Sequence, residues 1–228
     1  MKSAREFVSE FVSEFVGTFA LTFIGGAAII QTRNADAGVG LVEVALAHGL
    51  IYFAMISVFM KTAGHFNPAV SLGLLVTGRI TSLQTAIYIA GQFAGAILAA
   101  LLLQALFPVA LWEAARGTRQ MVSLDVSTGR AFALEAIATF FLMLAVMGTA
   151  VDKDGPKIGG LAIGMTLTAG MLAIGPLTGG SMNPARSIGP MIATGAYEGV
   201  ALYLAAPIVG AVIAAVLYRY LLLDAAPE

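Results

Sequence analysis

The chain has 228 residues, of which 59% are hydrophobic and only 11% are charged, and its mean hydropathy is +0.90. A soluble domain carries about twice that charged fraction, so the composition indicates a membrane protein with the lipid bilayer as its main solvent. The formal net charge of −1 gives no reason to expect nucleic acid as a partner. Without cysteine, and with only two histidines, neither a thiolate nucleophile nor a Cys or His metal site is predicted, and no cofactor is expected.

Six segments are long and apolar enough to cross a bilayer, whose hydrocarbon core of about 30 Å needs roughly 20 helical residues. The first follows Lys2 and Arg5 and continues to Gln31 without a convincing cleavage site, so we interpret it as a retained span and not as a signal peptide. The predicted spans lie near residues 10–31, 39–60, 83–106, 131–151, 158–177 and 200–222.

Two Asn-Pro-Ala triplets each follow a glycine-containing loop and precede an apolar stretch too short to cross a bilayer. Asparagine is a good N-cap and proline is tolerated at the first helical position, so a short helix is predicted to begin after Asn67 and another after Asn183. The simpler alternative to a functional role is that each asparagine only caps a helix. The occurrence of the triplet at matching places in the two halves favours a functional role. The residues are Asn67, Pro68, Ala69, Asn183, Pro184 and Ala185.

An internal repeat divides the chain. Segments 14–21 and 135–142 both begin with Glu, carry Thr four residues later, and precede their own Asn-Pro-Ala by about fifty residues. Each half holds three spans, an odd number, so the second half must be inserted upside down relative to the first. We expect one domain over 1–228, made of inverted repeats at 1–115 and 116–228.

Basic residues flanking the spans predict the orientation, because cytoplasmic loops are enriched in Lys and Arg. The side that carries both termini has the larger number and is therefore expected to be cytoplasmic. The composition favours an inner membrane, which the chain would cross several times. The basic residues are Lys2, Arg5, Lys61, Arg79, Lys153, Lys157 and Arg219 on one side and Arg33, Arg116, Arg119 and Arg130 on the other.

The loops before the triplets are predicted to line a polar channel, because irregular backbone at membrane depth must be buried in protein or face water. Two helix N-termini, each with about half a positive charge, would repel cations and protons there. The side-chain amides of Asn67 and Asn183 would donate hydrogen bonds to a neutral solute. The carbonyls expected along the path belong to Gly64, His65, Phe66, Gly180, Ser181 and Met182.

Residues 64–70 and 181–190, with the two Glu-x-x-x-Thr segments, resemble the aquaporin, or major intrinsic protein, family over essentially the whole chain. The resemblance implies an all-α membrane fold of six transmembrane helices and two half-helices. It implies passive conduction of water or small neutral solutes, usually by a homotetramer with one pore per subunit. Because the sequence offers no nucleophile, metal cluster or phosphate loop, no enzymatic activity is expected.

The resemblance also implies a narrow filter of four residues. Arg186 matches its arginine, and a permanent charge in a membrane loop is costly enough to indicate a function. Gly180 and Met171 match two further positions. The fourth is either Ala47, by counting, or His48, by the local pattern, and we choose His48. The alternative that His48 packs between helices stays open.

This filter looks more like the tonoplast-type filters of plants than like that of a strict water channel. Because Gly180 lacks a side chain and Met171 is flexible, the opening is expected to admit ammonia or glycerol beside water. Ser187 stands where glycerol facilitators usually carry aspartate, which favours the water-channel interpretation. A glycerol or polyol facilitator remains the alternative.

Glu14 and Glu135 lie in apolar spans, where an ionisable residue indicates a proton relay or a structural site. The resemblance implies that both are structural brackets that accept hydrogen bonds from the pore loops. A proton relay would instead indicate a coupled transporter, and a third class is a structural protein of membrane junctions.

Overall fold

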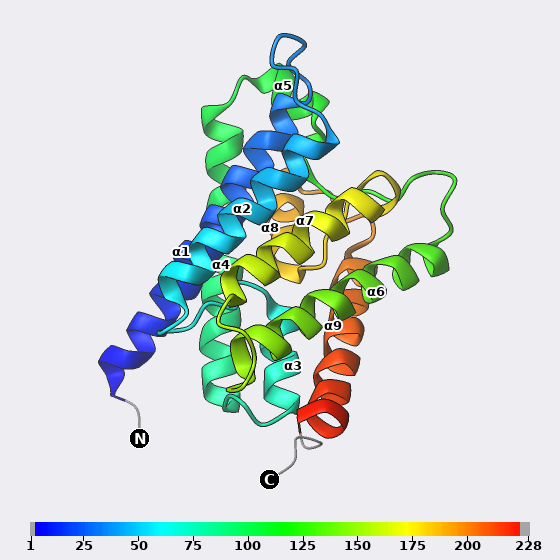
Figure 1. Ribbon diagram of the computed structural model, residues 1–228. Helices are drawn as coiled ribbons and strands as arrows, with labels where there is room; N and C mark the ends of the chain where they lie inside the picture. The colour runs from blue at the N-terminus through cyan, green and yellow to red at the C-terminus, as the bar shows by residue number, and fades with distance from the viewer. Residues whose placement is uncertain (1–2, 224–228) are drawn as a thin grey trace.

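The computed structural model describes residues 3–223, which form helices and no strand (Figure 1). The predicted all-α membrane fold is therefore confirmed. The α-helices are α1 (Ala4–Gln31), α2 (Leu41–Phe59), α3 (Pro68–Val76), α4 (Ser82–Leu106), α5 (Val109–Ala114), α6 (Thr128–Val146), α7 (Gly159–Thr178), α8 (Pro184–Thr194) and α9 (Val200–Leu217). A 3-10 helix, η1 (Arg116–Thr118), and two π-helices, η2 (Met147–Val151) and η3 (Tyr218–Leu223), complete the described chain.

Six helices of the described chain are long and apolar enough to span a membrane, which confirms the six predicted spans. The largest difference is at α1, which begins at Ala4 and not near residue 10. The reason is a capping box: the Glu6 amide donates to Ser3 Oγ (3.3 Å) and the Ser3 amide donates to Glu6 Oε2 (2.7 Å). The six spans are Ala4–Gln31, Leu41–Phe59, Ser82–Leu106, Thr128–Val151, Gly159–Thr178 and Val200–Leu223.

The short helices α3 and α8 begin directly after Asn67 and Asn183, as predicted. Each asparagine has extended backbone and caps its helix with its side-chain oxygen, while proline occupies the first turn. Neither helix has the length of a span, so both triplets lead into half-helices.

The long helices pack in pairs, α1 along α4, α2 along α7 and α6 along α9 (Figure 1). The short helices cross over: α3 packs against α9, and α8 packs against α4. Glycine permits the closest approach, since a Cβ atom on Gly95 would lie 2.3 Å from the Phe15 carbonyl oxygen. Such small residues replace the hydrophobic drive that is missing between helices in lipid.

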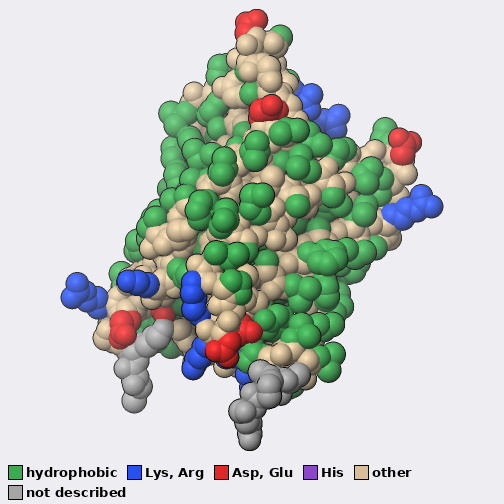
Figure 2. Space-filling view, in the orientation of Figure 1, with side chains coloured by type: hydrophobic (Ala, Val, Ile, Leu, Met, Phe, Trp, Pro, Cys, Tyr) green, Lys and Arg blue, Asp and Glu red, His purple; other side chains and the backbone are tan. Residues whose placement is uncertain are grey.

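Apolar side chains cover the middle of the molecule, and charged side chains gather toward its two ends (Figure 2). We call the end that carries α5 the α5 side, and the opposite end, where α1 begins and η3 ends, the terminal side (Figure 1). The long connection 107–130 contains α5 and η1. The buried polar groups lie between the two ends, around α3 and α8.

Candidate functional site

Asn67 and Asn183 meet in the interior through reciprocal hydrogen bonds. Asn67 Nδ2 donates to the Met182 carbonyl at 2.7 Å, and Asn183 Nδ2 donates to the Phe66 carbonyl at 2.8 Å. Their side-chain oxygens face the other way and accept from the amides of Ala69 and Ala185, both at 3.0 Å. Since a carboxamide carries two N–H hydrogens, each asparagine retains one donor beyond the reciprocal bond.

The residue before each asparagine has a left-handed backbone. Phe66 has φ of 51° and Met182 has φ of 50°, a region that non-glycine residues rarely occupy. Both side chains are fully buried. A Cβ atom on Gly17 would lie 2.1 Å from Phe66 Cε1, and one on Gly170 would lie 2.6 Å from Met182 Sδ, so the two glycines make the space that these side chains fill.

Glu14 holds the loop before α3. Its Oε1 accepts the amides of Gly64 (2.8 Å) and His65 (2.7 Å), and its Oε2 accepts the amide of Phe66 (2.6 Å). Gln92 Nε2 completes the set with a bond of 2.6 Å to Oε2. Four donors thus converge on one buried carboxylate, which ties α1 and α4 to the loop.

Glu135 holds the loop before α8 in a similar way. Its Oε1 accepts the Ser181 amide (2.8 Å) and the Thr178 hydroxyl (2.7 Å), and its Oε2 accepts the Met182 amide (2.8 Å). Ser187 Oγ is hydrogen-bonded to Ser181 Oγ and links α8 to the same loop. The loop is therefore fixed from α6, α7 and α8.

Five of the six predicted carbonyls already accept a hydrogen bond from a side chain. His65 accepts from Tyr52 (2.7 Å), and Gly180 and Ser181 accept from Arg186 (3.1 and 3.4 Å). Phe66 and Met182 accept from the two asparagines, as described above. Since a carbonyl oxygen has two lone pairs, each of these groups retains one acceptor position.

Arg186 is only 2% exposed although it is a permanent cation. Its Nη1 donates to the two carbonyls of the preceding loop, while its Nε and Nη2 have no hydrogen-bond partner in the described chain. Burying such donors without partners is costly. The guanidinium therefore presents donors that suit a polar solute.

The structure also places the other predicted filter residues. Met171 on α7 lies close to Gly180, since a Cβ atom on Gly180 would be 3.5 Å from Met171 Cγ. His48 on α2 is 1% exposed, its Nδ1 is 2.8 Å from the Val44 carbonyl oxygen, and its ring packs against α1, where a Cβ atom on Gly25 would lie 2.1 Å from His48 Nε2. Ala47 is only partly buried. We call His48, Met171, Gly180 and Arg186 the candidate filter.

Two cavities approach this region from opposite sides. The cavity on the α5 side has a volume of about 390 Å³, and Met171 and Gly179 are among its lining residues. The cavity on the terminal side has a volume of about 150 Å³, and Tyr52, Gly64 and His65 are among its lining residues. The reciprocal asparagine bonds thus lie between loops that open into different cavities.

Three residues of the site, Gln92, Thr178 and Gly17, were not predicted from the sequence, because they carry no charge and lie outside the Asn-Pro-Ala triplets. A lone amide in an apolar span, such as Gln92, was a signal that could have been used, because polar groups in spans are costly. Gly17 gave no comparable signal, since glycine is frequent throughout this chain. Among residues 3–223 no cluster of three or more His, Cys, Asp or Glu side chains could hold a metal ion.

Comparisons with known proteins give consistent matches. A sequence model described as Major intrinsic protein matches residues 1–218. The chain is 38% identical over 204 residues to Nodulin-26 of Glycine max, covering 87% of this chain and 72% of the relative. It is 39% identical over 202 residues to Aquaporin TIP4-4 of Zea mays, covering 85% and 78%. The X-ray structure of the aquaglyceroporin from Plasmodium falciparum superposes with a TM-score of 0.84 at 26% identity, covering 94% of this chain and 96% of that one.

Proposed function

The chain belongs to the major intrinsic protein family and forms a passive channel for water, and we propose that the path runs through the junction of Asn67 and Asn183. The observation that carries this path is the position of the two asparagines. They join two half-helices between a cavity on the α5 side and a cavity on the terminal side. Each asparagine keeps one N–H donor for a passing solute.

The candidate filter is proposed as the narrowest part of the path. Arg186 offers Nε and Nη2 as donors, and Gly180 lies directly against α7, where a Cβ atom on Gly180 would be 3.3 Å from Met171 Cα. His48 is preferred to Ala47, because the His48 side chain is buried whereas Ala47 is only partly buried. The positive charge of Arg186 and the N-termini of α3 and α8 oppose cations and protons.

Small neutral solutes, including ammonia and glycerol, are proposed as further substrates. The supporting features are the absence of a side chain at Gly180 and the flexible side chain of Met171. The similar solved structure from Plasmodium falciparum is titled an aquaglyceroporin, which makes glycerol the solute to test first. Ser187 argues in the opposite direction, so selectivity for water over glycerol has to be measured.

Glu14 and Glu135 are proposed as structural brackets and not as proton carriers. Each is buried and accepts three or more hydrogen bonds from one pore loop and its neighbours, so it acts on the shape of the path. A carboxylate that accepts these fixed hydrogen bonds suits a structural role, because a proton relay requires a neighbouring group with which the carboxylate exchanges a proton.

The chain is a multi-pass membrane protein, and we propose an inner membrane with both termini in the cytoplasm. The basic residues Lys61, Arg79, Lys153 and Lys157 in loops between the spans support this orientation. On this basis the α5 side faces outward. A homotetramer with one pore per subunit, and inverted repeats at 1–115 and 116–228, are part of the same proposal.

Stopped-flow light scattering of proteoliposomes tests the function. Vesicles are shrunk with an impermeant osmolyte and, separately, with glycerol, and are compared with empty liposomes. Faster shrinkage with glycerol re-swelling at the empty-liposome rate identifies a water-selective channel. Accelerated re-swelling identifies a channel that also conducts polyols, and no acceleration of either contradicts the proposed path.

A further inference from the structure

Three arginines line the cavity on the α5 side. Arg33 comes from the loop after α1, Arg116 from η1 and Arg119 from the segment that follows. Neither Asp nor Glu is among the residues that line this cavity. We call these three residues the arginine mouth. Because Met171 and Gly179 also line the cavity, the arginine mouth adjoins the candidate filter.

Arg116 is presented by a left-handed turn. Arg116, Gly117 and Thr118 have φ of 52°, 62° and 61° in succession. Two non-glycine residues in this region persist only where surrounding contacts impose them, and such residues cluster at functional sites. Here the contact is with α8: a Cβ atom on Gly117 would lie 2.1 Å from Thr194 Cγ2. The turn is therefore held tightly and aims Arg116 at the cavity.

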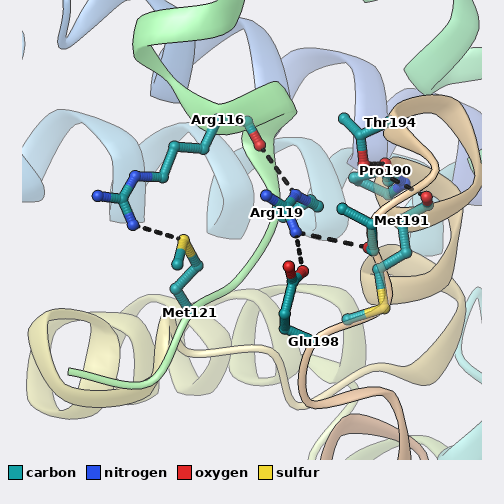
Figure 3. Close-up of polar contacts among 8 residues, drawn as sticks. Arg116, Arg119, Met121, Pro190, Met191, Thr194 and Glu198 are labelled. Carbon is teal, nitrogen blue, oxygen red and sulfur yellow. Dashed lines mark hydrogen bonds and ion pairs between the residues drawn. The ribbon is translucent and has the colours of Figure 1, made fainter. Parts of the chain in front are cut away.

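Only one of the three arginines has a counter-ion in the described chain. Arg119 pairs with Glu198, and its Nε donates to the Arg116 carbonyl at 3.3 Å (Figure 3). Arg116 Nη1 meets only the sulfur of Met121, at 3.0 Å, and sulfur is a weak acceptor. Arg33 forms no ion pair with any described carboxylate. Two arginines of the mouth thus form no ion pair within the described chain.

Glu198 remains charged at neutral pH. Its own backbone amide and the Arg119 guanidinium hold the pKa of Glu198 below its ordinary value. Glu198 is therefore committed to Arg119, and Arg33 and Arg116, which form no ion pair with a described carboxylate, remain available to an external anion.

We propose that the arginine mouth binds a small multivalent oxyanion, such as a polycarboxylate, and that the bound anion slows water entry. Guanidinium groups bind carboxylates through paired, charge-assisted hydrogen bonds. A concave site lined by one sign of charge also concentrates counter-ions. The volume of about 390 Å³ falls within the range of small-molecule sites. The effect on water rests on the proposed path, whereas anion binding does not.

Isothermal titration of citrate into the detergent-solubilised protein, at fixed ionic strength and without added lipid, tests the binding. We expect saturable binding that becomes about tenfold weaker in the double variant Arg33→Gln, Arg116→Gln, since two charge-assisted contacts are removed. Arg130→Gln is the matched control, because Arg130 is exposed in the first turn of α6 and does not line the cavity. Glu198→Gln should tighten binding, because it releases Arg119.

Three binding results would overturn the proposal. They are no saturable binding to the wild-type protein, equal weakening by Arg130→Gln, and unchanged binding in the double variant. If the substitution in the tight turn at Arg116 prevents folding, the single variant Arg33→Gln replaces the double variant. Arg33→Gln alone should also weaken citrate binding.

The effect on flux is measured by stopped flow with citrate equilibrated on both sides of the vesicle membrane, against chloride at equal ionic strength. We expect citrate to slow osmotic shrinkage of wild-type vesicles and not of the double variant. Binding without slowing would refute the blocking step. If the protein binds citrate but conducts no water in either salt, the proposed water path is contradicted, whereas the proposed anion site is supported.

Discussion

Glu14 Oε2 accepts the backbone N–H of Phe66 at 2.6 Å, and Phe66 is held at φ of 51°. A left-handed conformation costs a non-glycine residue about 1–2 kcal/mol. The same relationship recurs between Glu135 and Met182, with a bond of 2.8 Å and φ of 50°. In each case a buried carboxylate stabilises the strained residue directly before the Asn-Pro-Ala triplet.

Glu14→Gln should destabilise the protein. Both carboxylate oxygens of Glu14 accept N–H donors, and in the glutamine an NH2 group would replace one oxygen and leave its donors without an acceptor. Each buried donor left unsatisfied costs about 1–3 kcal/mol, so a loss of about 3 kcal/mol is expected. Thermal unfolding in detergent measures it, with Glu113→Gln on exposed α5 as the control. A variant with wild-type stability and lost proton coupling would instead favour a relay.

Gly17→Ala should destabilise the protein more than Gly170→Ala. The new Cβ meets the rigid ring of Phe66 at 2.1 Å in the first case and the flexible end of Met182 at 2.6 Å in the second. Overpacking costs about 1–3 kcal/mol, and we expect the two variants toward opposite ends of that range. Gly129→Ala is the control, since nothing lies within 4 Å of its Cβ position. Equal unfolding temperatures for Gly17→Ala and Gly129→Ala would refute the packing argument.

Arg186→Ala should widen the candidate filter and remove its charge. Glycerol re-swelling is expected to become several-fold faster, and a proton leak should appear in vesicles loaded with a pH-sensitive dye. Arg130→Ala, which changes an exposed arginine on α6, should alter neither measurement. Unchanged glycerol and proton permeability in Arg186→Ala would place the narrowest point elsewhere.

The ion pair of Glu198 and Arg119 should make the stability of the folded protein depend on pH, with a sign that follows from the pKa of Glu198. Because the pKa of Glu198 is lowered in the folded protein, mainly by its own backbone amide and then by Arg119, the pair stabilises above the ordinary Glu value of about 4.3. That stabilisation is lost as pH falls through the lowered pKa. The difference in unfolding temperature between wild type and Glu198→Gln should be constant from pH 5 to 8 and should disappear in stronger acid. A difference that changes between pH 6 and 8 would contradict this assignment.

The spans and half-helices could be predicted because their signals are local. Apolar length defines a span, and the Asn-Pro pair defines where α3 and α8 begin. Helix α1 begins at Ala4, ahead of the apolar segment, because of the capping box of Ser3 and Glu6, a pattern that is present in the sequence but that hydropathy does not register.

The features that the sequence does not predict depend on tertiary contacts. The left-handed turn at Arg116 and Thr118 contradicts local propensity, and contact with α8 imposes it. The convergence of Gln92 and Glu14 joins residues from α1 and α4 that no local pattern connects. Five of the six predicted carbonyls accept hydrogen bonds from Tyr52, Arg186 or the two asparagines, and these bonds depend on the folded arrangement of the pore loops.

The crossing of the short helices, α3 onto α9 and α8 onto α4, has a consequence for biosynthesis. A chain leaves the ribosome from its N-terminus, so α3 enters the membrane long before the surface of α9 exists. Until α9 is made, Glu14 can bind the loop before α3, but α3 lacks the helix against which it packs in the finished protein. The first pore loop to be made must therefore be among the last parts of the protein to reach its final place.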